Sequence, residues 1–391
     1  MLPFEKAIET VLTAARPLKA ERVDISLAVG RVLSQDVESD IDMPPFNKSA
    51  MDGFACRRAD LDSVLTVVET IPAGSVPKKS IGPGRCAKIM TGAMVPEGAD
   101  CVIMKEFVEI LPEDTIRFTG AETSDNICQK AEDIKAGQVV LNSGSKIGPQ
   151  DIAVLASVGQ TRPLVAVRPR VAVIATGDEL VEPSAKPGRS QIRNSNSFQL
   201  VAQIETTSAI ATNYGTAGDT DKAIEGAFAK AIEENDVVIV SGGVSVGDFD
   251  FVPAVLKRNG MDLLFEKVAI KPGKPTVFGT SPNGYCFGLP GNPVSTFVLF
   301  EIMVKPFLYK LMGHDYKPLT VQMTMDRSIV SKKAKRQRWV PVKMTDSRAV
   351  VPVEYHGSAH INSLCGATGL ICMDAGVTEI KKDQPVIVSI I

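Results

Sequence analysis

Four segments between Arg170 and Met312 have the same form, which is a short apolar run followed by a turn rich in Gly, Pro, Asp or Lys. They are residues 171–180, 237–251, 269–280 and 285–300. In a parallel α/β sheet such turns follow the strands and gather at one edge, where folds of this class bind ligands. The segments therefore predict strands of one sheet, with a ligand site at their carboxyl ends.

Two stretches between these strands have the periodicity of helices. Apolar residues recur at helical spacing over residues 223–232, after a cap at Asp219 or Thr220. A shorter stripe over residues 252–256 ends at Asn259-Gly260. The alternation of strands and helices predicts an α/β fold with a doubly wound sheet.

The chain has 391 residues, which is too long for one ordinary core, so two to four domains are expected. Short apolar runs at 64–71, 86–91, 101–110 and 115–119 predict a β-rich module, and alternating runs over 319–391 predict a small all-β domain. We predict an N-terminal linker region (1–44 with 140–168), an inserted β-rich module (45–139), the α/β domain (169–313) and a C-terminal β domain (314–391).

Composition and charge exclude several classes of protein. The net charge of −2 gives no bulk attraction to nucleic acid or to an anionic membrane. The seven cysteines are odd in number and form no CxxC pair, so neither a disulfide framework nor a structural zinc site is expected. No apolar run reaches transmembrane length, and the N-terminus lacks the basic region of a signal peptide. We therefore expect a cytoplasmic chain.

The turn after residues 171–175 contains Thr176, Gly177, Asp178 and Glu179. A glycine there lets the backbone approach a ligand, and the two acids have the oxygen ligands that Mg²⁺ prefers. Acids also fill ordinary turns, so this string by itself is a weak signal.

The turn after residues 237–240 is rich in glycine and hydroxyl groups, among them Gly242, Gly243 and Ser245. Backbone N–H groups of such a loop suit a phosphate or pyrophosphate. Asp248 and Asp250 follow at once, and carboxylates beside a phosphate indicate a bridging metal. The alternative is a tight structural turn.

Two further turns have groups that suit an anion. Lys271 and Lys274 lie three residues apart on a loop stiffened by prolines, although a solvated turn is the alternative. Pro293 suits the first position of a helix that Asn292 can cap, and Ser295 adds a donor at its N-terminus. That helix is apolar nearly all round over 297–304, so it is buried in its own domain or against a partner chain.

Three segments upstream of the α/β domain concentrate polar residues in turns. Asp52 lies in a polar group within residues 42–55, Thr91 ends an apolar run, and Asp133 lies beside lysines within 124–140. A surface turn, a hairpin-like loop and a solvated charged turn are the respective alternatives.

Taken together, the chain closely resembles the MoeA family of molybdopterin molybdenumtransferases, which includes the E-domain of gephyrin. The resemblance covers essentially the whole chain and rests on six strings in this order: SAMDGFA, IMTGAMVPEGAD, ATGDEL, SGGVSVGDFD, AIKPGKP and GLPGNPVS. It implies an enzyme that takes adenylylated molybdopterin and molybdate, inserts the metal and releases AMP in a Mg²⁺-dependent step. Tungstate has the same shape and charge as molybdate, so both anions stay open.

The resemblance also implies an elongated subunit of four regions that works as a homodimer, with a central domain like the MogA-type adenylyltransferase, its expected partner. The cleft would lie between this domain and the β-rich module of the other subunit. The apolar helix favours such an interface, so Asp52 and Thr91 are expected to face the partner's loop 242–250.

Site residues carry over from the family motifs position by position. Catalytic roles fall on Asp52, Thr91, Asp133, Lys271 and Lys274, magnesium on Glu179 and Asp250, and substrate binding on Thr176, Gly177, Gly242, Gly243, Ser245, Ser295, Arg336 and Ser358. The chain departs from the motifs at Phe54 (usually Tyr), Ala131 (usually Gly) and Arg338 (usually Glu).

Two other functions fit the same sequence. Gephyrin uses this domain as a scaffold that anchors receptors, and a different nucleotide-dependent transferase could be built on the same loops. Molybdate-dependent release of AMP from adenylylated molybdopterin separates the three.

Overall fold

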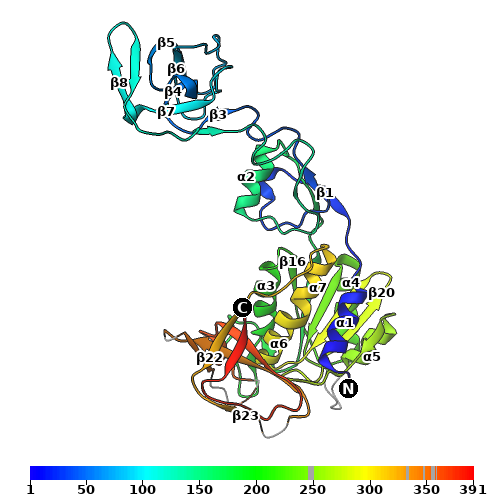
Figure 1. The fold of residues 1–391 in the computed structure, drawn as a ribbon. Helices are drawn as coiled ribbons and strands as arrows, with labels where there is room; N and C mark the ends of the chain where they lie inside the picture. Colours follow the sequence, from blue (N-terminus) through cyan, green and yellow to red (C-terminus); the bar gives the residue numbers. More distant parts are fainter. Residues whose placement is uncertain (245–250, 332–333, 347, 354–356, 358) are drawn as a thin grey trace. The chain divides into compact units, whose positions relative to one another are not determined.

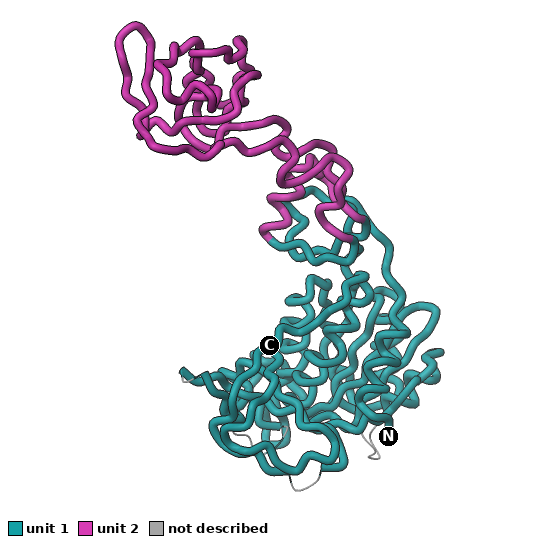
Figure 2. Tube along the Cα trace, in the orientation of Figure 1, with its two compact units in different colours: residues 1–35, 143–148, 164–391 teal, residues 36–142, 149–163 magenta. Residues whose placement is uncertain are grey.

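The computed structural model describes residues 1–244, 251–331, 334–346, 348–353, 357 and 359–391. The chain forms two compact units (Figure 2). Unit 1 comprises residues 1–35, 143–148 and 164–391, and unit 2 comprises residues 36–142 and 149–163. No helix in the described part of the chain has the length and apolar character needed to cross a membrane.

Unit 1 contains the α/β domain that the sequence predicts (Figure 1). Within the described residues, its sheet has the strand order β16 (Ile210–Ala217), β13 (Arg170–Thr176), β17 (Val237–Ser241), β21 (Gly284–Leu289), β20 (Val277–Ser281) and β18 (Asp262–Phe265). The first four strands are parallel, and β20 and β18 run antiparallel to their neighbours. The sheet is therefore mixed, because the short hairpin between β20 and β21 reverses the chain.

Helices cover both faces of this sheet, as a doubly wound fold requires. Side chains of β13 alternate between two cores, with Val171 and Val173 in one and Ala172 and Ile174 in the other. The helices of unit 1 are α1 (Phe4–Ala14), α3 (Asn196–Glu205), α4 (Asp221–Glu234), α5 (Val252–Arg258), α6 (Pro293–Leu299) and α7 (Lys305–Leu311). Thr220 caps α4 by accepting a hydrogen bond from the N–H of Ala223 at 3.3 Å, which confirms the predicted cap.

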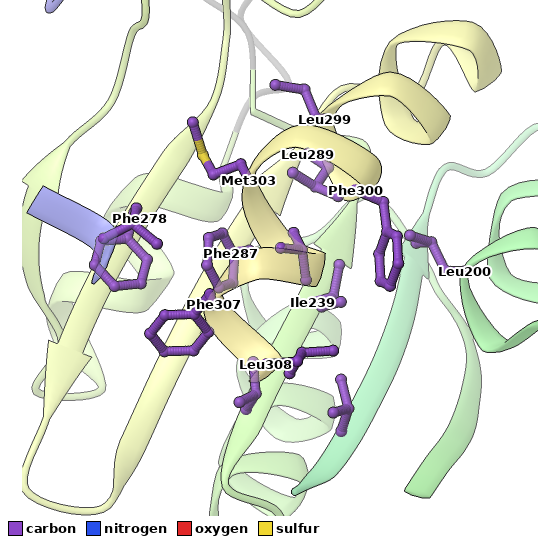
Figure 3. Close-up of a cluster of buried hydrophobic side chains, with 14 of the residues drawn as sticks. Leu200, Ile239, Phe278, Phe287, Leu289, Leu299, Phe300, Met303, Phe307 and Leu308 are labelled. Carbon is purple, nitrogen blue, oxygen red and sulfur yellow. The ribbon is translucent and has the colours of Figure 1, made fainter. Parts of the chain in front are cut away.

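The apolar segment after Pro293 forms α6, a π-helical turn (Phe300–Val304) and α7 in direct succession. Phe300 and Phe307 are fully buried in the core of their own unit (Figure 3). The Phe307 ring lies 5.6 Å from that of Phe278 and 5.2 Å from that of Phe287, at centroids. Of the two predicted surroundings, burial in its own domain is therefore the observed one, and the segment gives no argument for a partner chain.

A second sheet in unit 1 belongs to the C-terminal β domain. Within the described residues its strand order is β19 (Ile270–Lys271), β24 (Gln337–Met344), β25 (Ala349–Pro352), β22 (Thr320–Met325), β28 (Pro385–Ile390) and β26 (Gly369–Met373), and β26 also pairs with β24. This last pairing closes the sheet into a barrel. The expectation that residues 269–280 form one strand and turn of the central sheet is wrong, because β19 joins this barrel and only β20 joins the central sheet.

Short strand pairs complete unit 1. They are β1 (Ala20–Arg22) with β12 (Leu164–Ala166), β14 (Leu180–Val181) with β15 (Ile192–Arg193), and β23 (Ile329–Val330) with β27 (Glu379–Ile380).

Unit 2 is built on a β-sheet, as its apolar runs predict. The strand order among the described residues is β7 (Cys101–Met104), β4 (Gly53–Cys56), β6 (Arg85–Ile89), β5 (Val64–Ile71), β9 (Thr115–Phe118) and β8 (Val108–Leu111). Its other elements are α2 (Pro149–Ser157) and the pairs β3 (Lys48–Ser49) with β10 (Ile127–Cys128) and β2 (Val37–Glu38) with β11 (Val139–Leu141). The predicted run 101–110 is divided between β7 and β8, because a short 3₁₀ turn at Lys105–Phe107 separates them.

Candidate functional site

A cavity of about 480 Å³ in unit 1 is lined by residues that follow the parallel strands. Thr176 ends β13 and Ser241 ends β17, so the cavity lies at the carboxyl edge of the sheet. Its polar lining includes Thr176, Glu179, Asn194, Asn196, Ser241 and Asn292. A larger cavity of about 650 Å³ is lined by residues such as Asp236 and Gly284, which precede β17 and begin β21 at the opposite ends of the strands.

The predicted glycine-rich loop passes close to the end of β13. Gly242 has a φ of +104°, and a Cβ there would lie 2.6 Å from the carbonyl oxygen of Thr176. Only glycine tolerates this approach, because any side chain would collide with backbone atoms. Gly243 follows with a φ of +61°, so the loop turns back directly over Thr176. Ser245 and Asp250 lie outside the described residues.

Two buried polar atoms on this cavity have no hydrogen-bond partner among the described residues. They are the Thr176 Oγ1 atom and the Asn196 Oδ1 atom. The Asn196 Nδ2 atom donates to Ser241 Oγ at 2.9 Å and to the Gly291 carbonyl oxygen at 2.8 Å. Because a carbonyl oxygen can only accept, the amide cannot be flipped, and the unpaired atom is an acceptor. Leaving such a group unpaired costs about 1–3 kcal/mol, so the cavity is suited to a ligand that donates a hydrogen bond.

The predicted acids, Asp178 and Glu179, follow the carboxyl end of β13. A Cβ at Gly177 would lie 2.5 Å from Glu179 Oε2, so the Glu179 carboxylate folds over this glycine. The neighbouring Asp178 accepts a hydrogen bond from the N–H of Asp219 at 3.0 Å and donates its own N–H to Asp219 at 3.3 Å. Among the described residues there is no group of three or more His, Cys, Asp or Glu side chains arranged to hold a metal ion.

The lysine loop lies against the helix that begins at the cavity. Gly273 packs so closely on α6 that a Cβ there would lie 2.6 Å from Leu299 Cδ1. Lys271 and Lys274 flank this contact and are exposed, whereas Ser295 is only 2% exposed. Lys271 pairs with Arg338 across β19 and β24, and Arg336 donates to the Ile270 carbonyl oxygen at 3.2 Å. Convergence of both lysines with Ser295 on one anion stays a prediction. Ser358 lies outside the described residues.

The start of α6 differs from the prediction in one detail. Pro293 occupies the first turn as expected, but the Asn292 side chain makes no capping hydrogen bond. Asn292 instead lines the cavity, and its carbonyl oxygen accepts from the Thr296 N–H at 3.1 Å. The backbone therefore closes the first turn, and the amide side chain is not needed as a cap.

Asp52 and Thr91 are in direct contact in unit 2. The Asp52 Oδ1 atom accepts from the Thr91 N–H at 2.8 Å and from the Thr91 hydroxyl at 2.7 Å, and Oδ2 lies 3.4 Å from Lys105 Nζ. Hydrogen bonds from the Thr91 backbone and hydroxyl, together with Lys105, lower the pKa of Asp52 below its usual value. Sequence reasoning missed Lys105, because it meets Asp52 only through the antiparallel pairing of Gly53 with Met104.

Asp133 lies on a turn of unusual backbone shape in the same unit. Its N–H donates to the Met43 carbonyl oxygen at 3.1 Å. Ala131, two residues earlier, has a φ of +61°, which is the left-handed conformation that glycine favours. Of its neighbours, Lys130 pairs with Asp42 at 3.2 Å. The backbone thus keeps a glycine-type turn although glycine is absent.

Family profiles match nearly the whole chain. Residues 2–159 match the MoeA N-terminal region (domain I and II), residues 172–310 match a probable molybdopterin binding domain, and residues 327–391 match the MoeA C-terminal region (domain IV).

Similar proteins extend over the same length. A molybdopterin molybdenumtransferase of Staphylococcus epidermidis is 36% identical over 395 residues, which cover 97% of this chain and 93% of that protein. One from Staphylococcus aureus is 34% identical, covering 98% of this chain and 94% of that protein. Crystal structures of molybdopterin biosynthesis MoeA proteins from Pyrococcus horikoshii align with TM-scores of 0.84 and 0.87, at 31% and 30% identity, over 100% of this chain and at least 99% of theirs. The chain therefore belongs to the MoeA family of molybdopterin molybdenumtransferases, which are enzymes of molybdenum cofactor biosynthesis.

Proposed function

We propose that this transferase inserts the metal of molybdate into adenylylated molybdopterin and releases AMP in a Mg²⁺-dependent step. The observation that supports this reaction most directly is the cavity at the carboxyl edge of the sheet. There the glycine-rich backbone at Gly242 and the carboxylate of Glu179 line or border one space. Backbone N–H groups suit phosphate oxygens, and a carboxylate beside them suits a bridging cation.

Among the described residues that line the cavity, Glu179 has the carboxylate available to the proposed magnesium ion. Glu179 supplies hard carboxylate oxygens on the cavity, and Asp250 is its proposed second ligand from the next loop. Magnesium would neutralise charge on the phosphates during cleavage of the adenylate bond.

The chain's own residues would bind and orient the reactants. Lys271, Lys274 and Arg336 have the positive charge that a tetrahedral dianion requires, and Ser295 and Ser358 are proposed to add donors. Asp52 is held by three donors and stays ionised, so its proposed role is to orient a donor group of the substrate rather than to carry a proton. Positioning and electrostatics would then account for catalysis.

The proposal includes the oligomeric state of the protein, its partner enzyme and its compartment. We expect a homodimer in which unit 2 of one protomer completes the site on unit 1 of the other, supplied with substrate by a MogA-type adenylyltransferase in the cytoplasm. The family resemblance supports this arrangement, whereas the buried α6–α7 segment does not bear on it.

The test is release of AMP from adenylylated molybdopterin by the purified full-length chain. AMP should appear only with both molybdate and Mg²⁺, in step with cofactor that reconstitutes an apo-molybdoenzyme. A chelator of Mg²⁺ should stop both signals, and tungstate should be tested beside molybdate. Equal release of AMP without any oxyanion would identify a hydrolase and contradict the proposal.

A further inference from the structure

Three cationic side chains meet where the lysine loop joins the C-terminal barrel. The parallel pairing of β19 with β24 places Lys271 directly beside Arg338. Arg336 immediately precedes β24 and lies close enough to Lys271 to repel its ammonium group. Its Nη1 atom reaches the carbonyl oxygen of Ile270, the residue before Lys271. We call Lys271, Arg336 and Arg338 the cationic cluster.

No acid balances this cluster within the part of the chain that the structure describes. None of its three members forms an ion pair there, and the acids Glu5 and Asp374 are bound by the intervening Gln337. Gln337 donates to Glu5 at 2.9 Å and to Asp374 at 3.4 Å. Desolvation by the neighbouring residues of the chain, and then repulsion from Arg338 and Arg336, lower the pKa of the Lys271 ammonium.

One nitrogen of the Arg338 guanidinium is hydrogen-bonded, and another has no hydrogen-bond partner among the described residues. Its Nη1 atom donates to the Val330 carbonyl oxygen at 3.3 Å, which fixes the direction of the side chain. Its Nε–H is buried and has no partner among the described residues. A planar guanidinium is a strong donor for an oxyanion, and its rigid fork loses little entropy on binding.

We propose that Arg338 is a further binding residue for the tetrahedral oxyanion and sets its preference for two negative charges over one. With Lys271 and Arg336 it forms a site whose mutual repulsion is relieved in proportion to the charge of the ligand. Sequence motifs do not point to this residue, because it stands where the family usually has an acid. The inference rests on the proposed function only for the identity of the anion as molybdate.

The experiment measures oxyanion binding to the full-length chain by isothermal titration calorimetry. Molybdate and perrhenate are the probes, because both are tetrahedral oxoanions of similar size that carry charges of two and one. Wild type should bind molybdate more tightly than perrhenate. Arg338→Gln should weaken molybdate roughly tenfold or more, since a charge-assisted hydrogen bond is lost, and should weaken perrhenate less. Arg338→Lys, which keeps the charge, should recover most of the preference.

Arg327→Gln is the matched control. It removes a guanidinium from the same barrel domain that donates to the Pro352 carbonyl oxygen at 2.9 Å, and it should leave both affinities unchanged. If Arg338→Gln does not fold, Arg338→Met removes the charge with an unbranched side chain instead, and the same loss of molybdate affinity is expected.

Two results would overturn the inference. One is equal binding of molybdate and perrhenate by wild type, and the other is wild-type molybdate affinity in folded Arg338→Gln. If either is seen while molybdate-dependent AMP release is normal, the inference falls and the proposed function stands. If AMP release fails while Arg338→Gln loses molybdate, the proposed function falls and the anion site stands.

Discussion

At the scale of single residues, two asparagines that line the cavity in unit 1 differ in whether their side-chain amides have hydrogen-bond partners. Asn194 is paired on both sides of its amide, with Ser197 N–H at 3.1 Å and with the hydroxyls of Ser197 and Thr216 at 3.0 and 3.3 Å. Asn196, two residues on, has both donors occupied and its acceptor empty. The amide of Asn194 has all its hydrogen-bond partners within the protein, whereas the Oδ1 atom of Asn196 has none among the described residues. Asn196 is therefore the amide that is suited to a ligand.

The magnesium assignment is tested at Glu179. Glu179→Gln keeps the size of the side chain and removes its charge, so Mg²⁺-dependent turnover should be lost. The melting temperature should change little, because exposed loop substitutions usually cost within about 0.5 kcal/mol. Glu182→Gln, the same change at an exposed position on the other side of β14, should keep wild-type turnover. A magnesium titration curve for Glu179→Gln that matches wild type would remove Glu179 from the metal site.

The contacts of Asp52 predict how the stability of unit 2 depends on pH. Because its folded pKa is lowered, the stability that its ionised form contributes is present above the unfolded pKa, which is 3.8, and is lost as pH falls through the folded pKa. Thr91→Val and Lys105→Met should each raise the pKa of Asp52, because each removes a group that lowers it.

Carboxyl carbon NMR titration of the labelled chain measures both shifts. Thr115→Val is the control: it removes a hydroxyl at the start of β9 that donates to the Pro112 carbonyl oxygen at 2.7 Å, and it should leave the Asp52 titration unchanged. Identical Asp52 titrations in wild type and Thr91→Val would show that the hydroxyl contact is absent in solution.

At the scale of elements, the turn before Asp133 contains backbone strain that one substitution can release. Ala131 is left-handed at φ +61°, which costs a non-glycine residue roughly 1–2 kcal/mol. Ala131→Gly should therefore raise the free energy of unfolding, by up to about 1 kcal/mol after the greater flexibility of glycine in the unfolded chain is subtracted. Ala136→Gly, on the same loop but without a positive φ, should lower it.

Urea unfolding followed by far-UV circular dichroism is the measurement, because the single tryptophan, Trp339, lies in unit 1 and does not report on unit 2. Destabilisation by Ala131→Gly as large as that by Ala136→Gly would mean that residue 131 is not left-handed in solution.

At the scale of the whole molecule, the open question of mechanism is whether one active site uses two protomers. Asp52→Asn and Lys274→Ala alter different units, so each variant should be inactive alone. In an equal mixture that exchanges subunits, half of the dimers are mixed and each holds one intact site of two. About a quarter of wild-type activity should then return. Native mass spectrometry must show mixed dimers, and their inactivity would place the whole site within one chain.

The amino-acid sequence by itself indicated β13, β17 and β21, together with α4, α5 and the helix that begins at Pro293. It also indicated the positions of the site loops. These features act through neighbours within a few residues, as in the continuous apolar runs at 171–174 and 237–240, the Thr220 cap and Pro293 at the start of α6. The motif strings also identified the family, since each loop conformation needs particular residues such as Gly242.

Only the tertiary structure decided which distant side chains meet. The pairing of β19 with β24 brings Arg338 to Lys271, and the pairing of β4 with β7 brings Lys105 to Asp52. It also decided that the apolar segment 297–304 packs within its own core and that residues 269–280 are shared between two sheets. These contacts depend on strand register between elements tens of residues apart, and register is set by the packing of the whole domain rather than by local sequence.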